Sequence, residues 1–309
     1  MRLPDAAAGR RITAPVAGAL HTRLDALRRL DDQLGSGQLQ PLAEAELQLI
    51  TDLLTAGSYS QATMNSLFSA ASEASRICGW LAYDTGHHTT ARRHYLTALR
   101  TAAGAGDDIA GAHALSYAAI QAYSTDRPRD AVKMLDAAHS RTRSVATPRM
   151  QAMLHARQAR AFSKTGGDRA ACIRAINAAF DAYAQGPHDD DPAFTYWVSE
   201  AELLSIAGSS ALSQGDHRQA ISYFRRATDA AAYDATGYPR AAAIYYVRAA
   251  EAHLGLGEME DACSAASRAV RCLGRVNSSR GSGTLADLRT HLGRCDSVPI
   301  VRDVLDEIA

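Results

Sequence analysis

The strongest constraint on the fold is a short frame of small residues and one aromatic residue that recurs along the chain. Its form is G-x4-A-x3-[YF]-x2-A, and it matches fully from Gly86 to Ala98 and again from Gly215 to Ala227. Looser copies place Ala or Leu in the aromatic position, or Asp in the glycine position. They begin at Asp126, Gly166 and Gly257, with a degenerate first copy at Gly57. Self-similarity of this kind is the sequence signature of a repeat protein.

The frame has a simple structural meaning. A glycine just past the end of a helix can take the left-handed conformation that closes the helix. In the next helix, the two alanines and the aromatic occupy relative positions 0, +4 and +7, so they share one face. Small alanines let the preceding helix approach, and the aromatic fills the gap. Because one such hairpin cannot bury its apolar face alone, we expect several to stack.

The spacing of the copies indicates the type of repeat. The first alanine falls at positions 91, 131, 171, 220 and 262, at intervals of 40, 40, 49 and 42 residues. Tetratricopeptide repeats are about 34 residues long and HEAT-like repeats about 40–47, but the alanine pattern favours the tetratricopeptide type with lengthened helices or loops. The interval of 49 contains an insertion, AQGPHDDDPAF, at 184–194. We predict an all-α, tetratricopeptide-like right-handed superhelix of about five to six hairpins, with turns near residues 57, 86, 126, 166, 215 and 257.

The two ends of the chain differ from the repeats. We expect a leading tail and amphipathic helix at 1–36, repeats at 37–278 and capping helices at 279–309. The leading helix, 17–34, carries a stripe of leucines: Leu20, Leu24, Leu27, Leu30 and Leu34. Two short helices are expected around 282–293 and 298–308. These helices would cap the open ends of the solenoid, or the leucine stripe would pack on a second copy and form a homodimer.

Composition excludes several classes of function. Basic and acidic residues are equal in number, 33 of each, which argues against direct binding to nucleic acid. No run of about 18 apolar residues is long enough to cross a membrane. The cysteines are scattered, without a C-x-x-C pair, which argues against a zinc site and a disulfide framework. We therefore predict a cytoplasmic protein without a cofactor or a metal.

Two clusters resemble metal sites. Asp84 precedes His87 and His88, and a second cluster, HDDD, covers 188–191. Both fall where the frame predicts a turn or a loop, and adjacent histidines at a helix start project about 100° apart. We predict an exposed turn for the first cluster. For the second we predict an exposed loop that ends in a helix N-cap at Asp191, similar to the N-cap expected at Thr147.

The first helix of each hairpin is expected to line the concave groove of the superhelix. Polar and aromatic residues at helical spacing on these helices are the candidate ligand contacts, since such residues supply contact area and orientation in binding sites. The candidates are Arg76, Trp80, Tyr83, Asp84, His113, Tyr117, Gln121, Arg157, Arg160, Tyr196, Trp197, Glu200, Tyr245 and Arg248. The alternative is that many of them are contacts between helices. Trp80 and Trp197 would then be core residues, and Arg157 or Arg160 would pair with Glu200 or Glu202.

The chain also resembles a known family over roughly residues 20–309. Six segments in order resemble the C-terminal tetratricopeptide region of actinobacterial helix-turn-helix transcriptional regulators of the XRE type. These segments are RRLDDQLGSG, LLTAGSYSQA, GWLAYDTGHHTTARRHYLTALRTAAGAGD, TPRMQAMLHARQARAFSKTGGDRAAC, YWVSEAELLSIAG and LGEMEDACSAASRAV. In those regulators a DNA-binding domain of about 70 residues precedes this region. Here Met1 lies close to the RRLDD segment, so the resemblance implies the sensory or interaction half alone.

Two functions remain as hypotheses. The resemblance implies a regulatory protein that binds a peptide, a small-molecule signal or a partner protein in its groove. The alternative is an enzyme on a helical-repeat scaffold, with Asp84, His113, Glu200 and Arg160 as an acid–base group in the groove. No P-loop, nucleophile elbow or H-E-x-x-H helix accompanies that group. The frame and the resemblance therefore favour the non-catalytic binding protein.

Overall fold

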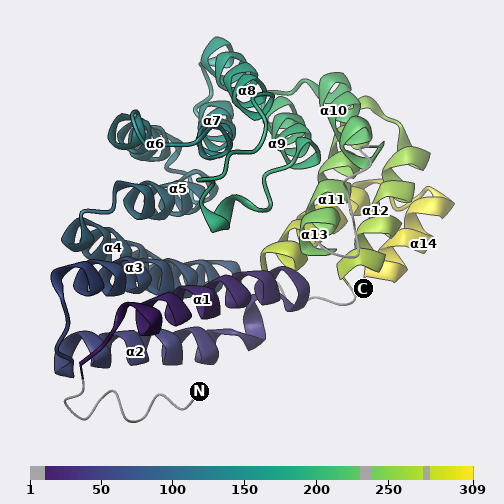
Figure 1. The fold of residues 1–309 in the computed structure, drawn as a ribbon. Helices are drawn as coiled ribbons and strands as arrows, with labels where there is room; N and C mark the ends of the chain where they lie inside the picture. Colours follow the sequence, from purple (N-terminus) through teal and green to yellow (C-terminus); the bar gives the residue numbers. More distant parts are fainter. Residues whose placement is uncertain (1–10, 230–238, 274–278, 309) are drawn as a thin grey trace.

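The chain folds into consecutive antiparallel helix pairs (Figure 1). A computed structural model describes residues 11–229, 239–273 and 279–308. The five hairpins are α3 (Gln61–Asp84) with α4 (His88–Ala105), α5 (Asp108–Ser124) with α6 (Pro128–Thr142), α7 (Pro148–Ser163) with α8 (Arg169–Tyr183), α9 (Glu200–Ser213) with α10 (His217–Asp229), and α11 (Pro239–Leu256) with α12 (Met259–Leu273). The described residues form no strand, only an isolated bridge between Arg11 and Ser58. The predicted all-α, tetratricopeptide-like fold is confirmed.

The turn glycines of the frame take the expected conformation. Gly86, Gly166, Gly215 and Gly257 have φ values of 84°, 79°, 76° and 77°. Asp126 occupies the same position in its copy with φ 56°, and it is the one non-glycine with positive φ among the described residues. Asp tolerates this region better than most residues because its short side chain can bond locally.

The copy at Gly57 does not follow the frame. Gly57 has an extended backbone, with φ −85°, and Ala62 is exposed. The small residue is needed here for close packing, because an added Cβ would lie 2.3 Å from Cδ1 of Ile12 and 2.6 Å from the Leu53 carbonyl oxygen. The turn predicted near residue 57 is present, between α2 (Gln40–Ala56) and α3. Its packing differs from that of the other turns.

The first helices of the hairpins form the inner wall of the superhelix. Each contacts the next in the series α3, α5, α7, α9 and α11, and α13 (Ser279–Leu292) continues it. The leading helix α1 (Ala14–Leu34) contacts both α3 and α11. Figure 1 shows the C-terminal helices returning to the side of α1. The inner helices therefore form a closed ring.

The leucine stripe of α1 is used inside the chain. Leu20, Leu24 and Leu27 are buried in a core shared with α3, and Leu30 is partly buried against it. Only Leu34 is exposed, at 42%. Most of the stripe therefore packs within the chain, and both the capping role and a homodimer stay predictions.

The C-terminal helices are α13 and α14 (Pro299–Ile308), close to the predicted ranges. They cover α11 and α12 with apolar residues that include Leu288, Leu292, Val301 and Val304. The boundary predicted at residue 278 lies outside the described residues. Among the described helices, none combines the length and the apolar character that crossing a membrane requires.

Candidate functional site

The ring of inner helices surrounds a partly open cavity of about 600 Å³, which we call the chamber. Its walls come from α1, α3, α5, α7, α9, α11 and α13, and from the residues between α8 and α9. This volume lies within the range of about 300–1,000 Å³ that is typical of ligand pockets. Because α1 and α13 both contribute, the chamber is assembled from the two ends of the chain.

The insertion between α8 and α9 lies inside the ring. We call residues 184–199 the inner loop; it contains one 3₁₀ turn, η2 (Ala193–Thr195). Phe194 stacks on His113 of α5, with ring centroids 3.6 Å apart and planes 9° from parallel. The hydroxyl of Tyr196 donates a hydrogen bond to the carboxylate of Asp32 on α1, and Arg29 lies 4.3 Å from the centre of the Tyr196 ring. The inner loop thus connects α5 to α1 across the ring.

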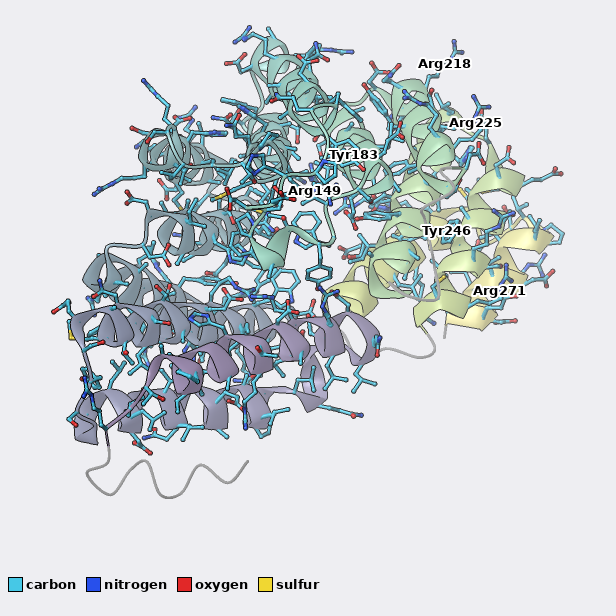
Figure 2. All side chains as sticks on the ribbon, in the orientation of Figure 1. Arg149, Tyr183, Arg218, Arg225, Tyr246 and Arg271 are labelled. Carbon is cyan, nitrogen blue, oxygen red and sulfur yellow. The ribbon has the colours of Figure 1, made fainter. Side chains whose placement is uncertain are left out.

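The first half of the inner loop is held from outside the chamber. Arg149 and Tyr183 lie side by side in Figure 2, with the guanidinium carbon 5.7 Å from the ring centre. Nε of Arg149 is 3.7 Å from Asp191, whose carboxylate also accepts a hydrogen bond from the His188 backbone N–H at 3.0 Å. The acidic run at 188–191 therefore fixes the conformation of the inner loop.

The helix start predicted at Asp191 is wrong. The residues after Asp191 form only η2, and α9 begins at Glu200 behind Ser199, whose hydroxyl accepts the Glu202 N–H at 3.2 Å. Tyr196 and Trp197 consequently lie in the inner loop and not on a helix. The cap predicted at Thr147 is confirmed, with its hydroxyl 3.4 Å from the Met150 nitrogen.

Tyr117 is the centre of an aromatic and cationic wall. The guanidinium carbons of Arg76 and Arg157 each lie 4.4 Å from its ring centre. Trp80 meets the same ring edge-on at 5.2 Å, and Arg157 also lies 5.2 Å from the ring of Trp197. Cation–π contacts are strongest where the cation is desolvated. This wall presents flat, polarised surfaces from α3, α5, α7 and the inner loop to the chamber.

A charge cluster behind this wall joins three helices. The Glu73 carboxylate accepts hydrogen bonds from Arg28 at 2.5 Å, from Arg76 at 2.6 Å and from Nδ1 of His113 at 3.2 Å. Burial alone would raise the pKa of Glu73, but Arg76, His113 and Arg28 hold it well below its usual range. Burial lowers the pKa of His113 to about 3, so the ring is neutral near pH 7 and its Nδ1 donates to Glu73.

Acidic side chains line the chamber as well, from α1, α9 and α13. Asp31 accepts hydrogen bonds from Nε1 of Trp80 at 2.9 Å and from the Ser36 hydroxyl at 2.8 Å. The Tyr245 hydroxyl donates to the carboxylate of Glu202. Asp32 and Asp287 also line the chamber. The lining therefore carries acids on α1, α9 and α13 and arginines on α1, α3, α7 and α11, which suits a ligand with charges of both signs.

Most of the predicted groove residues lie at the chamber. Ten of the fourteen line its wall: Arg76, Trp80, Tyr83, Tyr117, Arg157, Arg160, Tyr196, Trp197, Tyr245 and Arg248. That they contact a ligand stays a prediction. The structure brings them together from α3, α5, α7 and α11 and from the inner loop.

Four predicted residues lie elsewhere. Asp84 is completely buried and does not line the chamber. Gln121 donates a hydrogen bond from its side chain to the His88 carbonyl oxygen at 2.7 Å, and His113 binds Glu73 behind the wall. Glu200 is exposed as the first residue of α9. Helical spacing identified the inner helices, but it could not separate the face on the chamber from the faces that touch neighbouring helices.

The group proposed for acid–base chemistry is not assembled. Of Asp84, His113, Glu200 and Arg160, only Arg160 lines the chamber. The ion pairs considered for the arginines are also not formed. Arg157 hydrogen-bonds the Ser116 hydroxyl, and Arg160 hydrogen-bonds the hydroxyls of Ser163 and Ser213.

One group of described residues has the geometry of a metal site, and it lies outside the chamber. Potential ligand atoms of His253, Glu258 and Asp261 lie within 4.8 Å of one another at the α11–α12 turn. Nδ1 of His253 already lies 2.7 Å from Glu258. His87 and His88 are exposed at the α3–α4 turn as predicted, although the ring of His88 also reaches the chamber wall.

Sequence reasoning missed the contribution of α1 and, within the inner loop, that of Phe194. Arg28, Asp31 and Asp32 line the chamber from α1, and Phe194 does so from η2. A signal was present in RRLDD, whose charges lie beside the leucine stripe on a helix that was expected only to cap the solenoid. An insertion rich in aromatics after an acidic run was a second signal.

Comparisons with known proteins give a structural similarity without a family. No family model matches the sequence, and no curated protein matches it. The solved structure in question is a signal transduction ATPase with numerous domains from Pyrococcus horikoshii, described as having a tetratricopeptide repeat sensor. Sequence identity is 13% and the TM-score is 0.49, over 95% of this chain and 47% of the other. The present chain thus corresponds to about half the length of that protein.

Proposed function

We propose that this protein is a regulatory binding protein that holds a small molecule or a short peptide in the chamber. The supporting observation is the chamber itself: about 600 Å³, closed by inner helices from both ends of the chain. Its arginine-flanked Tyr117 and its acids provide contact area and orientation together. A cavity of this volume favours a small ligand or a short peptide over a folded partner protein, which would need a larger surface.

Binding would be transmitted through closure of the ring. A ligand that contacts both Asp32 of α1 and Arg248 of α11 would favour the closed arrangement over any open one, in proportion to its difference in affinity. The inner loop would take part, because Tyr196 and Trp197 both line the chamber. By the resemblance to the sensory half of helix-turn-helix regulators, we infer that the signal passes to transcription.

The test is recovery of a bound molecule. The full chain, purified from its host, is examined by native mass spectrometry, and we expect a retained mass on the wild-type protein. Trp197→Ala removes a ring from the middle of the wall and is expected to lose this mass. Arg92→Ala, an exposed position on the outer helix α4, is the matched control and should retain it. Equal retention by the Trp197 variant would contradict the assignment of the chamber.

A further inference from the structure

A small polar recess opens from one end of the chamber. It has a volume of about 180 Å³ and lies between the α5–α6 turn, the end of α7 and α11. Tyr123, Ser124, Arg160 and Arg248 line both the recess and the chamber. A group of a few atoms would fit the recess while the rest of its molecule occupied the chamber.

Three cations converge on this recess. Arg160 and Lys164 come from the end of α7, and Arg248 comes from α11. Arg248 has an acidic partner, Glu251, at 3.3 Å. The acid that lines the recess itself is Asp126. Positive charge therefore exceeds negative charge at this end of the chamber.

Arg160 is buried without an acidic partner among the described residues. Only 8% of the surface of Arg160 is exposed. Its hydrogen bonds run from Nη1 to the neutral hydroxyls of Ser163 at 2.9 Å and Ser213 at 2.7 Å. Buried charges are normally paired, since an isolated one is costly. Its Nε and Nη2 have no acceptor among the described residues. A guanidinium of this kind at the edge of a polar recess is suited to a bound anion.

The electrostatic balance of the recess supports this interpretation. Burial and the neighbouring Arg248 lower the pKa of Arg160 to about 10. Partial burial, Arg160 and Arg248 lower the pKa of Lys164 to about 8, against a smaller opposing effect of Glu251 and Asp126. Cations whose pKa is lowered by burial and by neighbouring cations are stabilised in their charged form by a counter-ion.

We propose that the recess formed by Arg160, Lys164, Arg248 and Ser124 binds a compact anionic group, a carboxylate or a phosphate, of the ligand in the chamber. The inference rests on the proposed function, because it assigns the chemistry of one end of that ligand. The guanidinium of Arg160 would receive two anion oxygens in the planar fork geometry that arginine favours. Lys164 would contribute a point charge at the mouth.

The two lysines of the chain provide a direct test. Lys164 is at the recess, and Lys133, the other lysine of the sequence, is exposed on the outer helix α6. The full chain is labelled with an amine-reactive reagent at pH 7.5, and each site is quantified by peptide mass spectrometry. Sodium phosphate and sodium acetate, at matched ionic strength against chloride, serve as the two probes. A bound anion favours the unreactive ammonium form, so labelling of Lys164 should slow severalfold while that of Lys133 stays constant.

Variants separate a binding role from a structural one. Arg160→Gln keeps a polar side chain for Ser163 and Ser213 but removes the charge, and it should abolish the protection of Lys164. If Arg160 were only a structural contact, the variant would lose thermal stability and phosphate would still protect Lys164. Removing an unpaired buried charge should leave the ligand-free stability equal or higher. Protection by acetate alone would indicate a carboxylate, and protection by phosphate alone a phosphorylated molecule.

The result expected above pH 8 is weaker protection, because Lys164 loses its charge. The absence of protection by both probes, or equal protection in Arg160→Gln, would overturn the proposal. These outcomes are distinct from failure of the proposed function. If the Arg160→Gln variant retains the chamber ligand as well as the wild type does, the anion subsite alone is refuted. Protection of Lys164 in a protein that retains no ligand would refute the chamber function alone.

Discussion

At the scale of single residues, close approach of the two helices in a hairpin depends on one glycine facing one aromatic ring. A Cβ added to Gly79 would lie 2.7 Å from the ring of Tyr95, and one added to Gly208 would lie 2.9 Å from the ring of Phe224. Each glycine lies seven residues before the turn glycine of its own hairpin. The frame at the sequence level contained the aromatic but not its partner.

Gly79→Ala is therefore expected to destabilise the protein. Overpacking costs about 1–3 kcal/mol, and the better helix propensity of Ala offsets about 1 kcal/mol. We expect a net loss of up to about 2 kcal/mol in the free energy of unfolding, measured by urea denaturation. Gly18→Ala is the control: Gly18 lies in α1 with no atom within 4 Å of an added Cβ. That variant should gain about 0.5–1 kcal/mol.

His113 makes stability depend on pH. The unfolded chain protonates this residue near pH 6.5, whereas burial keeps it neutral in the folded protein down to about pH 3. A histidine with a lowered folded pKa contributes stability that is complete above the unfolded pKa and is lost as the pH falls. From pH 6.5 to pH 5 the loss is about 2 kcal/mol.

The measurement is the free energy of unfolding between pH 7.5 and pH 5. His113→Gln retains a donor for Glu73 but does not titrate. Over this range its free energy of unfolding should therefore fall by about 2 kcal/mol less than that of the wild type. His87→Gln, at the exposed α3–α4 turn, serves as the control. A pH slope in His113→Gln as steep as that of the wild type would disprove the assigned neutral histidine.

At the scale of elements, the inner loop is the segment that turns an open groove into a chamber wall. It is anchored at its first half by Arg149 and Asp191 and at its second half by Phe194 and Tyr196. Phe194 is 9% exposed although it lies outside any α-helix. Loops positioned by a rigid scaffold frequently carry binding residues, and this one carries three chamber aromatics, Phe194, Tyr196 and Trp197.

Phe194→Ala should release the second half of the inner loop. Truncation of a buried phenylalanine to alanine lowers the free energy of unfolding by about 3–5 kcal/mol. We expect the lower end here because the loop can relax. Hydrogen–deuterium exchange should increase over 193–199 and around His113. Ile173→Ala, at a 46% exposed position of α8, should leave exchange in the loop unchanged. Unaltered protection in Phe194→Ala would show that the stacking does not anchor the loop.

At the scale of the whole molecule, the ring is closed by contacts between residues far apart in sequence. Tyr196 and Asp32 are separated by 164 positions, and α1 touches α11 as well as α3. Acids of α1 and arginines of α7 and α11 thereby enclose one space. Because α1 contacts helices at both ends of the repeat series, a change in its exposure or position would indicate a change in ring closure.

Tyr196→Phe should loosen this closure without removing an aromatic ring. Loss of a hydrogen bond to a charged acceptor costs about 1.5–3 kcal/mol, and amide exchange in the C-terminal half of α1 should accelerate. Tyr223→Phe, on the outer helix α10, is the matched control and should not change exchange in α1. If both variants behave like the wild type, the hydroxyl of Tyr196 does not contribute to ring closure.

The sequence alone determined the helices, their pairing and most of the aromatic wall. These depend on residues four and seven positions apart, as at Ala91, Tyr95 and Ala98, because local helical geometry decides which side chains share a face. The same logic placed Trp80, Tyr117 and Arg157 on inner helices. It could not exclude Gln121 or Glu200, since every face of an inner helix carries polar residues.

Only the tertiary structure decided that the superhelix closes and what its interior contains. Closure results from small rotations between successive hairpins, which add up over the repeats and leave no mark in any local pattern. The meeting of Asp32 with Tyr196 follows from that closure. The stacking of Phe194 on His113, and the hydroxyl partners that Arg160 has in place of an acid among the described residues, follow from contacts between repeats. The physical reason is the range of the interactions in sequence. The frame specifies neighbours within a hairpin, whereas the chamber depends on contacts between the two ends of the chain.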